Sequence, residues 1–207
     1  MPNPTKQRIL NASVRLFNEH GVDAVRLQQI AEEIGISVGN LAYHFKTKDA
    51  IVESVYEQVL DEFTHIFRQY LQAPELSAFD QQLSLYYEFF RRYQFYLATF
   101  FKDTAETDRP QVAWQAAIQK MLLQLRSWLD FHVQRQVLRP EALPGQYDKL
   151  AESLWMTLVF FPAFCTMRGH LCDEGTYKQA VWAHLLPFFN EQGIAEFNEA
   201  VLPLINH

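Results

Sequence analysis

The chain has 207 residues, of which 49% are hydrophobic and 20% are charged. This composition supplies enough apolar side chains for a packed core and excludes an intrinsically disordered protein. The formal net charge of −6 at pH 7 also excludes a protein that coats nucleic acid without sequence preference, because that behaviour needs a strongly basic surface.

Two short helices are predicted near the N-terminus from the spacing of apolar residues. The first spans residues 5–20, with Thr5 as its cap and Gly21 at its end. The second spans residues 27–34 and exposes Gln28, whose side-chain amide is of the type that hydrogen-bonds adenine in the major groove.

A tight turn and a third short helix follow directly. Gly35 supplies the positive φ that favours a helix end, and the hydroxyl of Ser37 is placed to cap the next helix. Leu41 and Phe45 lie four residues apart and are predicted to face inward. The opposite side then carries Val38, Asn40, Tyr43 and His44. A short helix that is held by its neighbours and presents polar and aromatic groups outward has the geometry that enters a DNA major groove.

The rest of the chain is also predicted to be helical. Thr47 is placed to cap a long helix that runs to about residue 71. Further helices are predicted over residues 77–100, 112–137, 147–167, 177–189 and 194–205, the last of them after a break at Gly193. The predicted fold is all-α, with a three-helix helix-turn-helix domain over residues 1–48 and a larger helical ligand-binding and dimerisation domain over residues 49–207.

The charge distribution agrees with this division. Residues 1–48 contain six Lys and Arg and four Asp and Glu, so this segment carries +2 and the remainder carries −8. A slightly basic head on an acidic body is typical of a protein that selects particular duplex sites and avoids sticking along the rest.

The helices over residues 147–167 and 177–189 are each apolar on two faces. Two such helices cannot both hide every face inside a small monomer, so they are the predicted interface of a homodimer to which each subunit contributes the pair. The apolar run at 154–167 is shorter than the ~18 residues of a membrane span. It is therefore predicted to be a buried helix, and no membrane partner is expected.

The helix over residues 77–100 is rich in aromatic side chains around most of its circumference. Such a helix either lies in the centre of the body or lines a cavity, and the pattern leaves both possibilities open. The candidate lining residues for a small-molecule effector of unknown identity are Tyr93, Tyr96 and Phe100, with Trp128 and Phe160 on other helices.

No enzyme chemistry is predicted. The sequence has no glycine-rich phosphate loop, nucleophile elbow or HExxH segment. Cys165, His170 and Cys172 do not have the spacing of a zinc site, so neither a metal nor a cofactor is expected. Two cysteines and the polar first residues, without a signal peptide, predict a cytoplasmic location.

Six short segments near the N-terminus form one pattern, which is defined by their residues, their order and their spacing. They are Arg8-Ile9-Leu10-Asn11-Ala12, Leu16-Phe17, Gly21, Ile30-Ala31, Gly35-Ile36-Ser37-Val38-Gly39-Asn40-Leu41 and Tyr43-His44-Phe45-Lys46-Thr47-Lys48. Together they resemble the DNA-binding domain of the TetR family of bacterial transcriptional regulators, and the resemblance implies a DNA-binding mode and a dimer. Family members usually have Thr or Ser near positions 25 and 26 and an aromatic phosphate contact at 42, where this chain has Val25, Arg26 and Ala42. The contacts to the DNA backbone are therefore expected to shift to Tyr43, His44 and Lys48.

The leading hypothesis is a ligand-responsive dimeric repressor that binds a palindromic operator in double-stranded DNA. The residues expected to contact phosphates are Tyr43, His44, Lys46 and Lys48, with help from Thr47. Base contacts are expected from Val38 and Asn40, next to Ser37 at the start of the helix. Arg26 and Gln28 are expected to flank these contacts. The alternative is a helical ligand-binding or scaffold protein that acts through protein contacts without specific DNA binding, which Ala42 favours. Activation in place of repression would use the same residues.

Overall fold

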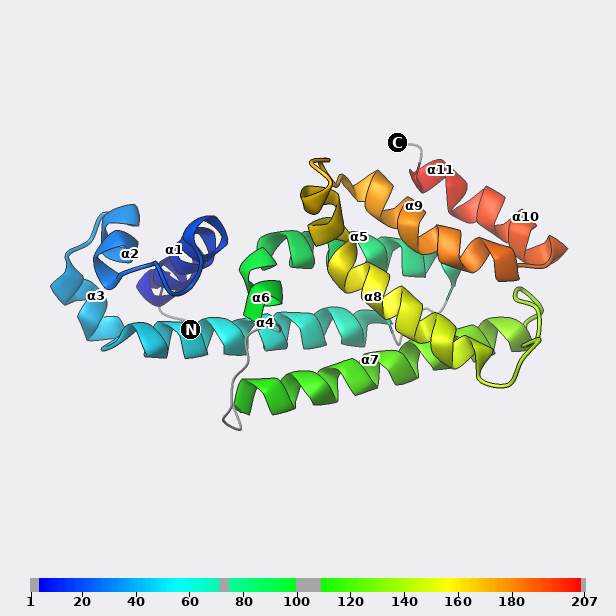
Figure 1. Cartoon of the computed structure of the whole chain (residues 1–207), viewed down its shortest axis with the longest axis horizontal. Helices are drawn as coiled ribbons and strands as arrows, with labels where there is room; N and C mark the ends of the chain where they lie inside the picture. Colours follow the sequence, from blue (N-terminus) through cyan, green and yellow to red (C-terminus); the bar gives the residue numbers. More distant parts are fainter. Residues whose placement is uncertain (1–3, 71–74, 100–108, 206–207) are drawn as a thin grey trace. The chain divides into compact units, whose positions relative to one another are not determined.

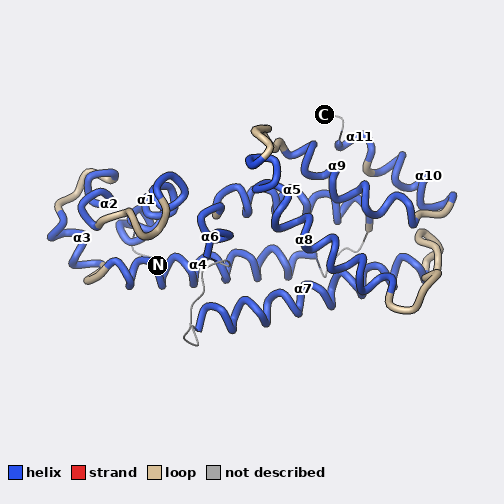
Figure 2. The backbone as a smooth tube through the Cα atoms, in the orientation of Figure 1, coloured by secondary structure: helices blue, strands red, loops and turns tan. Residues whose placement is uncertain are grey.

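The structure, a computed structural model, describes residues 4–70, 75–99 and 109–205 of the chain. Its helices are α1 (Pro4–His20), α2 (Leu27–Glu33), α3 (Val38–His44), α4 (Lys48–Tyr70), α5 (Leu76–Arg92), α6 (Gln94–Thr99), α7 (Arg109–Gln134), α8 (Gln146–Met167), α9 (Glu174–Leu185), the short 3-10 helix η1 (Leu186–Phe188), α10 (Glu191–Ala200) and α11 (Leu202–Ile205). Within these ranges no β-strand forms (Figure 2). An isolated bridge joins Leu138 to Phe189. The predicted all-α fold is confirmed.

The chain divides into two compact units, each formed by two stretches of sequence. Unit 1 comprises Met1–Phe63 and Arg92–Pro110, and unit 2 comprises Thr64–Arg91 and Gln111–His207. Helices α4 and α5 (Figure 1) therefore each contribute residues to both units. The predicted functional boundary after residue 48 stays a prediction, since compactness alone assigns no function to either unit.

The core of unit 1 is made by α1, α2, α3 and the first part of α4. Its fully buried side chains include Ile9, Ala12, Phe17, Ile30, Leu41 and Ile51. As predicted, α1 ends at His20, and Gly21 follows with a φ of +79°. The start of α1 differs from the prediction. The helix already includes Pro4, whose fixed φ suits the first helical position, so Thr5 lies within the first turn instead of ahead of it.

The segment predicted as one helix over residues 77–100 is interrupted. Helix α5 ends at Arg92 and α6 begins at Gln94. The side-chain amide of Asn18 in α1 occupies this break: its Nδ2 donates to Arg92 O at 2.8 Å, and its Oδ1 accepts from Phe95 N at 2.9 Å. Because the amide replaces hydrogen bonds that a continuous helix would make, the helix can break here without leaving those backbone groups unpaired.

Unit 2 packs around a buried carboxylate. Asp80 of α5 accepts hydrogen bonds from Lys178 Nζ at 2.8 Å and Trp182 Nε1 at 2.9 Å, and all three residues are buried. A buried charge is stable only when it is paired, so Asp80 ties α5 to α9. The ring of Trp182 also meets Phe79 of α5 and Phe197 of α10, with centroid distances of 5.5 and 5.2 Å.

The C-terminal helices have different bounds from those predicted. The helix expected over residues 177–189 spans Glu174–Leu185 and continues as η1, because Pro187 has no N–H to extend the α-helical hydrogen bonds. Gly193 does not break the chain as predicted. It lies in the first turn of α10, where Asn190 Oδ1 accepts a hydrogen bond from Gly193 N at 2.9 Å.

Helix α8 spans Gln146–Met167, within one residue of the predicted helix over 147–167, but it is less buried than predicted. Among the described residues it is the one helix long and apolar enough to cross a membrane, with a mean hydropathy of 1.4 over an 18-residue window that is 39% buried. The core helix of a soluble protein passes the same test, so one such helix is weak evidence of a membrane span. One face of α8 packs against α9, where Tyr177 Oη donates to Leu158 O at 2.9 Å.

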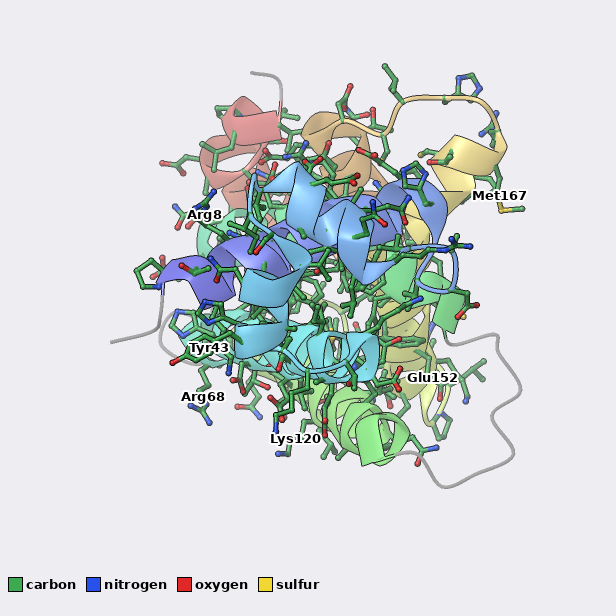
Figure 3. The ribbon with its side chains drawn as sticks, turned by 90° about the vertical axis from the view of Figure 1, so that its left-hand side faces the viewer. Arg8, Tyr43, Arg68, Lys120, Glu152 and Met167 are labelled. Atoms are coloured by element: carbon green, nitrogen blue, oxygen red, sulfur yellow. The ribbon has the colours of Figure 1, made fainter. Side chains whose placement is uncertain are left out.

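The other face of α8 exposes large apolar side chains. Met156, Phe164 and Met167 are 51%, 48% and 85% exposed, and Figure 3 shows Met167 directed away from the ribbon. In contrast, α9 buries its large apolar residues, including Trp182 and Leu185, within unit 2. The expectation that both helices would leave an apolar face uncovered is therefore met by α8 but not by α9, whose second face is covered by α5 and α10.

Candidate nucleic-acid interface

The turn between α2 and α3 forms as the sequence predicts. Gly35 has a φ of +69°, a conformation that favours glycine. Ile36 N then donates to Ala31 O at 3.0 Å and closes the turn. Ser37 Oγ accepts a hydrogen bond from Asn40 N at 3.1 Å, which caps α3. These contacts fix the direction in which α3 leaves the turn.

The inner face of α3 holds the helix in place. Leu41 and Phe45 are buried in unit 1, as predicted. A helix of 7 residues is too short to be stable alone. Its orientation is therefore set by the core beneath it, which gives the outer face a fixed geometry.

The outer face of α3 carries the side chains that the sequence placed there. Tyr43 is 85% exposed and lies at the edge of unit 1 (Figure 3), next to His44, with which its ring packs edge to face at 5.2 Å. Val38 and Asn40 are exposed as well. The helix thus offers a phenol, an imidazole and a carboxamide outward. Such groups hydrogen-bond to phosphates and base edges.

Two of the predicted contact residues already have partners within unit 1. Lys48 Nζ donates to Asp23 O at 3.0 Å, which ties the start of α4 to the loop before α2. Gln28 Nε2 donates to Glu32 Oε1 at 2.8 Å along α2. Either contact has to break or be shared before these side chains reach a DNA molecule.

The remaining candidates fall into capping hydroxyls and exposed cations. Thr47 Oγ1 accepts a hydrogen bond from Ala50 N at 3.2 Å and caps α4, as predicted, just as Ser37 caps α3. Lys46 and Arg26 are exposed. Among the predicted cationic contacts, these two have exposed side chains, whereas Lys48 is held within unit 1.

Cations of α1 also contact this region, and these contacts were not predicted from the sequence. Lys6 Nζ lies 5.0 Å from the centroid of the Phe45 ring, at the end of α3. Arg8 Nη2 donates to Ile34 O at 2.7 Å, at the end of α2. The position of both residues early in the first helix was visible in the sequence. Nothing in that position shows which neighbouring helix they contact.

The candidate ligand-lining residues are divided between the two units. Tyr93 and Tyr96 are buried in unit 1, whereas Trp128 is buried and Phe160 half-buried in unit 2. Phe100 lies outside the described residues. Burial raises the pKa of Tyr93 to about 12, so its hydroxyl stays protonated at neutral pH. The set remains a prediction.

Among the residues that the structure describes, no group of three or more His, Cys, Asp and Glu is placed to hold a metal ion. Cys165 and Cys172 are free thiols. Burial raises the pKa of Cys172 to about 12. The thiolate that metal ions and electrophiles require is therefore disfavoured at this cysteine.

Comparison with known sequences finds a family model and relatives that match the segment containing α2 and α3. Residues 9–55 match the family model described as bacterial regulatory proteins, tetR family. An uncharacterized HTH-type transcriptional regulator of Bacillus subtilis, YerO, is 29% identical over 127 residues, which cover 52% of this chain and 44% of YerO. The chain thus matches less than half the length of this curated relative.

Comparison with solved structures extends over nearly the whole chain. The crystal structure of a TetR-family transcriptional regulator from Marinobacter aquaeolei has a TM-score of 0.77 at 19% identity, covering 99% of this chain and 98% of that one. SmeT in complex with triclosan has a TM-score of 0.58 at 19% identity, covering 91% and 93%. At these identities the likeness to solved structures shows the fold alone. The sequence relatives are transcriptional regulators and not enzymes.

Proposed function

Because the chain belongs to the TetR family of bacterial regulatory proteins, we propose that it is a cytoplasmic transcriptional regulator that binds duplex DNA through α3. The observation that carries this proposal is Tyr43, a large side chain that is 85% exposed on a helix whose inner face is buried. Such a ring contributes little to the stability of unit 1. Against DNA, its hydroxyl donates to a phosphate while the rigid helix beneath it keeps the register.

In this proposal, different side chains on and around α3 contact the phosphates and the bases. Val38 and Asn40, which follow the Ser37 cap, approach base edges in the major groove. Tyr43, His44 and Lys46 hold the backbone, and Arg26 reaches the flanking phosphates. Lys48 acts mainly within the protein, because its ammonium group is held by Asp23 O at 3.0 Å.

The proposal includes a homodimer and a palindromic operator. The exposed apolar side chains of α8 support a second copy of the chain as their cover, with α9 beside α8 contributing its polar residues to the same contact. A two-fold dimer presents two α3 helices, which read half-sites about 34 Å apart on one side of the duplex.

Release by a small molecule completes the proposal, with repression as the default mode. SmeT, whose fold this chain shares, is a protein that binds triclosan. In this chain, the buried indole of Trp128 has no hydrogen-bond partner for its Nε1 among the described residues. A buried donor in that state favours a ligand or water that carries an acceptor. An effector that binds one body conformation better than the other shifts the protein away from its DNA-binding form.

The test is a selection from a random duplex library, followed by gel-shift titrations of the selected duplex at graded salt. Wild-type protein is expected to enrich a two-fold symmetric site. Lys46→Ala should weaken binding to all sequences and lower the salt slope by about one. Asn40→Ala should instead alter the preferred bases, and Tyr43→Ala should weaken binding with little change in preference. Lys120→Ala, an exposed lysine of α7, is the matched control and should bind as wild type does.

Two outcomes would contradict the proposal. One is a selection that enriches no site. The other is a complex that Tyr43→Ala and Lys46→Ala together leave unchanged. If the protein enriches no site but forms a ligand-binding dimer, the alternative of a helical ligand-binding or scaffold protein is correct.

A further inference from the structure

Three amide side chains form one polar face of α1. Gln7, Asn11 and Asn18 are separated by four and seven residues, so in a helix with 100° per residue they point in nearly the same direction. Gln7 Nε2 donates to Asn11 Oδ1 at 3.1 Å along this face. None of these residues contributes to the apolar core of unit 1, and all three bind other elements of the same unit.

Asn18 is bound to both sides of the α5–α6 break. In a continuous helix, Arg92 O would accept from the N–H of Tyr96, four residues later. Tyr96 N instead donates to Tyr93 O at 3.0 Å. Arg92 O accepts from Asn18 Nδ2 at 2.8 Å, and Phe95 N donates to Asn18 Oδ1 at 2.9 Å. One carboxamide on α1 therefore takes the place of a peptide group in the interrupted helix.

The rest of the polar face joins the same junction to α4. Tyr93 Oη donates to Glu62 Oε2 at 2.6 Å and accepts from Gln58 Nε2 at 3.0 Å. Gln58 Oε1 in turn accepts from Gln7 Nε2 at 3.1 Å. The hydroxyl of Tyr93 carries its proton at neutral pH, and burial raises its pKa further, to about 12, while the Glu62 carboxylate can only accept. The donor and acceptor roles in this chain of bonds are therefore fixed.

A second face of α1 holds the DNA-reading elements. Arg8 Nη2 donates to Ile34 O at 2.7 Å, and Arg15 pairs with Glu33 at 2.8 Å, both at the end of α2. Residues 8 and 15 are seven apart and, at 100° per residue, point about 70° away from the amide face. Helix α1 thus binds the start of the turn that precedes α3 with one face and the α5–α6 break with another.

We propose that Asn18 is a positioning residue for DNA binding: by gripping the α5–α6 break, it sets the orientation of α1 and, through Arg8 and Arg15, that of the turn that aims α3. This inference rests on the proposed DNA-binding function. The break lies where α5 passes from unit 2 into unit 1 along the chain. A change in α5 that shifts Arg92 O or Phe95 N therefore reaches α1 through this carboxamide.

Thermodynamic linkage between DNA binding and the two Asn18 hydrogen bonds predicts an effect of DNA on these bonds, which a contact that only stabilises unit 1 would not show. If the two Asn18 hydrogen bonds favour the DNA-binding form, then bound DNA must stabilise these hydrogen bonds by the same factor in equilibrium constant. The N–H of Phe95, which donates to Asn18, should exchange with deuterium more slowly when the selected duplex is bound. The exchange rate of this single amide reports the state of the grip directly.

The experiment uses the full chain and the duplex selected by the wild type. Asn18→Ala removes both hydrogen bonds and is expected to weaken binding to this duplex about tenfold, because each bond contributes on the order of a few-fold in equilibrium constant. Asn18→Asp keeps the acceptor for Phe95 N and places a carboxylate against Arg92 O, so it should weaken binding as well. Asn198→Ala, at an exposed asparagine of α10, is the matched control and should leave the affinity unchanged. In the wild type, the duplex should slow exchange at Phe95 several-fold, and in Asn18→Ala it should not.

The outcomes separate this inference from the proposed function. A wild type that binds no selected duplex removes the proposed function and this inference with it. If the wild type binds but Asn18→Ala binds equally well, the inference is wrong and the function stands. The same holds if Asn18→Ala binds weakly while the duplex leaves Phe95 exchange unchanged in the wild type, because Asn18 would then serve only the stability of unit 1. Circular dichroism of each variant checks that it is folded.

Discussion

Gly193 lies at a close backbone contact that leaves no room for a side chain. It lies in the first turn of α10, and an ideal Cβ built at this position would lie 2.2 Å from Val137 O, in the segment that follows α7. That distance is far inside van der Waals contact, and the obstacle is backbone, which cannot rotate aside as a side chain does. The close approach of the two segments therefore depends on the absence of a side chain.

Gly193→Ala is accordingly expected to lower the free energy of unfolding by about 2 kcal/mol, since overpacking a tight contact typically costs that much. Gly175→Ala is the matched control in the first turn of α9, where the nearest atoms to a new Cβ lie at 3.6 Å. It should be neutral or slightly stabilising because alanine favours helix. Denaturant unfolding of both variants checks the prediction, and equal stability for the two would contradict it.

At the scale of an element, the N-terminus of α9 is held by two carboxylates. Asp173 caps the helix by accepting from Thr176 N at 2.7 Å, and this bond lowers the pKa of its carboxyl group. Glu174 accepts from Ser84 Oγ at 2.6 Å and pairs with Lys178 at 3.0 Å. The bond from Ser84, followed by that from Lys178, lowers the pKa of Glu174. Both carboxylates are therefore more acidic in the folded protein than in the unfolded chain.

A lowered folded-state pKa stabilises the protein above the unfolded pKa and ceases to do so as pH falls through the folded value. The melting temperature is thus expected to fall between about pH 5 and pH 3, as the unfolded chain takes up protons more readily than the folded one. Glu174→Gln should lower stability at pH 7 and flatten this decline, because it removes one of the two carboxylates whose pKa is lowered by folding. Melting curves from pH 3 to pH 7 test this, and parallel curves for wild type and Glu174→Gln would show that the contact has no such effect.

The elements differ in how far their sequence determines them. The turn before α3 was predictable because Gly35, Ser37 and Leu41 act locally, each on neighbours within a few residues. The α5–α6 break was not, because the segment reads as a continuous aromatic helix and is interrupted by Asn18, a residue far away in sequence. The predicted break at Gly193 is wrong, because composition does not distinguish a glycine needed for its φ from one needed for close packing.

The contacts of the candidate site residues also depend partly on residues far away in sequence, which helical periodicity does not predict. Their outward or inward direction on α3 follows from helical periodicity, and the structure places Tyr43 and Leu41 accordingly. Which cations are engaged inside the protein does not follow from periodicity. Lys48 is bound to Asp23 O, while Lys46, two residues earlier, is exposed. That difference depends on where a loop carbonyl lies in three dimensions.

At the scale of the whole molecule, the uncovered face of α8 is the feature that supports the proposed homodimer. Large apolar side chains recur along it at 156, 160, 164 and 167, a spacing that forms one continuous stripe on a helix. Met156 and Phe164 are about half exposed and Met167 is 85% exposed. A stripe of this kind is stabilised by burial against an equivalent stripe across a two-fold axis.

We expect the wild type to sediment as a dimer at micromolar concentration and Met156→Glu combined with Phe164→Glu to sediment as a monomer. Two charges buried at the centre of an interface should weaken dimerisation by at least about 3 kcal/mol. Leu123→Glu, at a 68% exposed residue of α7, serves as the control and should stay dimeric. A monomeric wild type, or a double variant that remains dimeric, would exclude this face as the interface.

The assembly of unit 1 from two separated stretches has a consequence for protein engineering and for evolution. A chimera joined at a single point in α4 would bring a foreign α1 to the host's α5–α6 break, where the carboxamide of residue 18 meets the backbone of residues 92 and 95. A transplanted head therefore needs residues 92–99 to travel with it. The inherited module is discontinuous, and its two parts have to change together as lineages diverge.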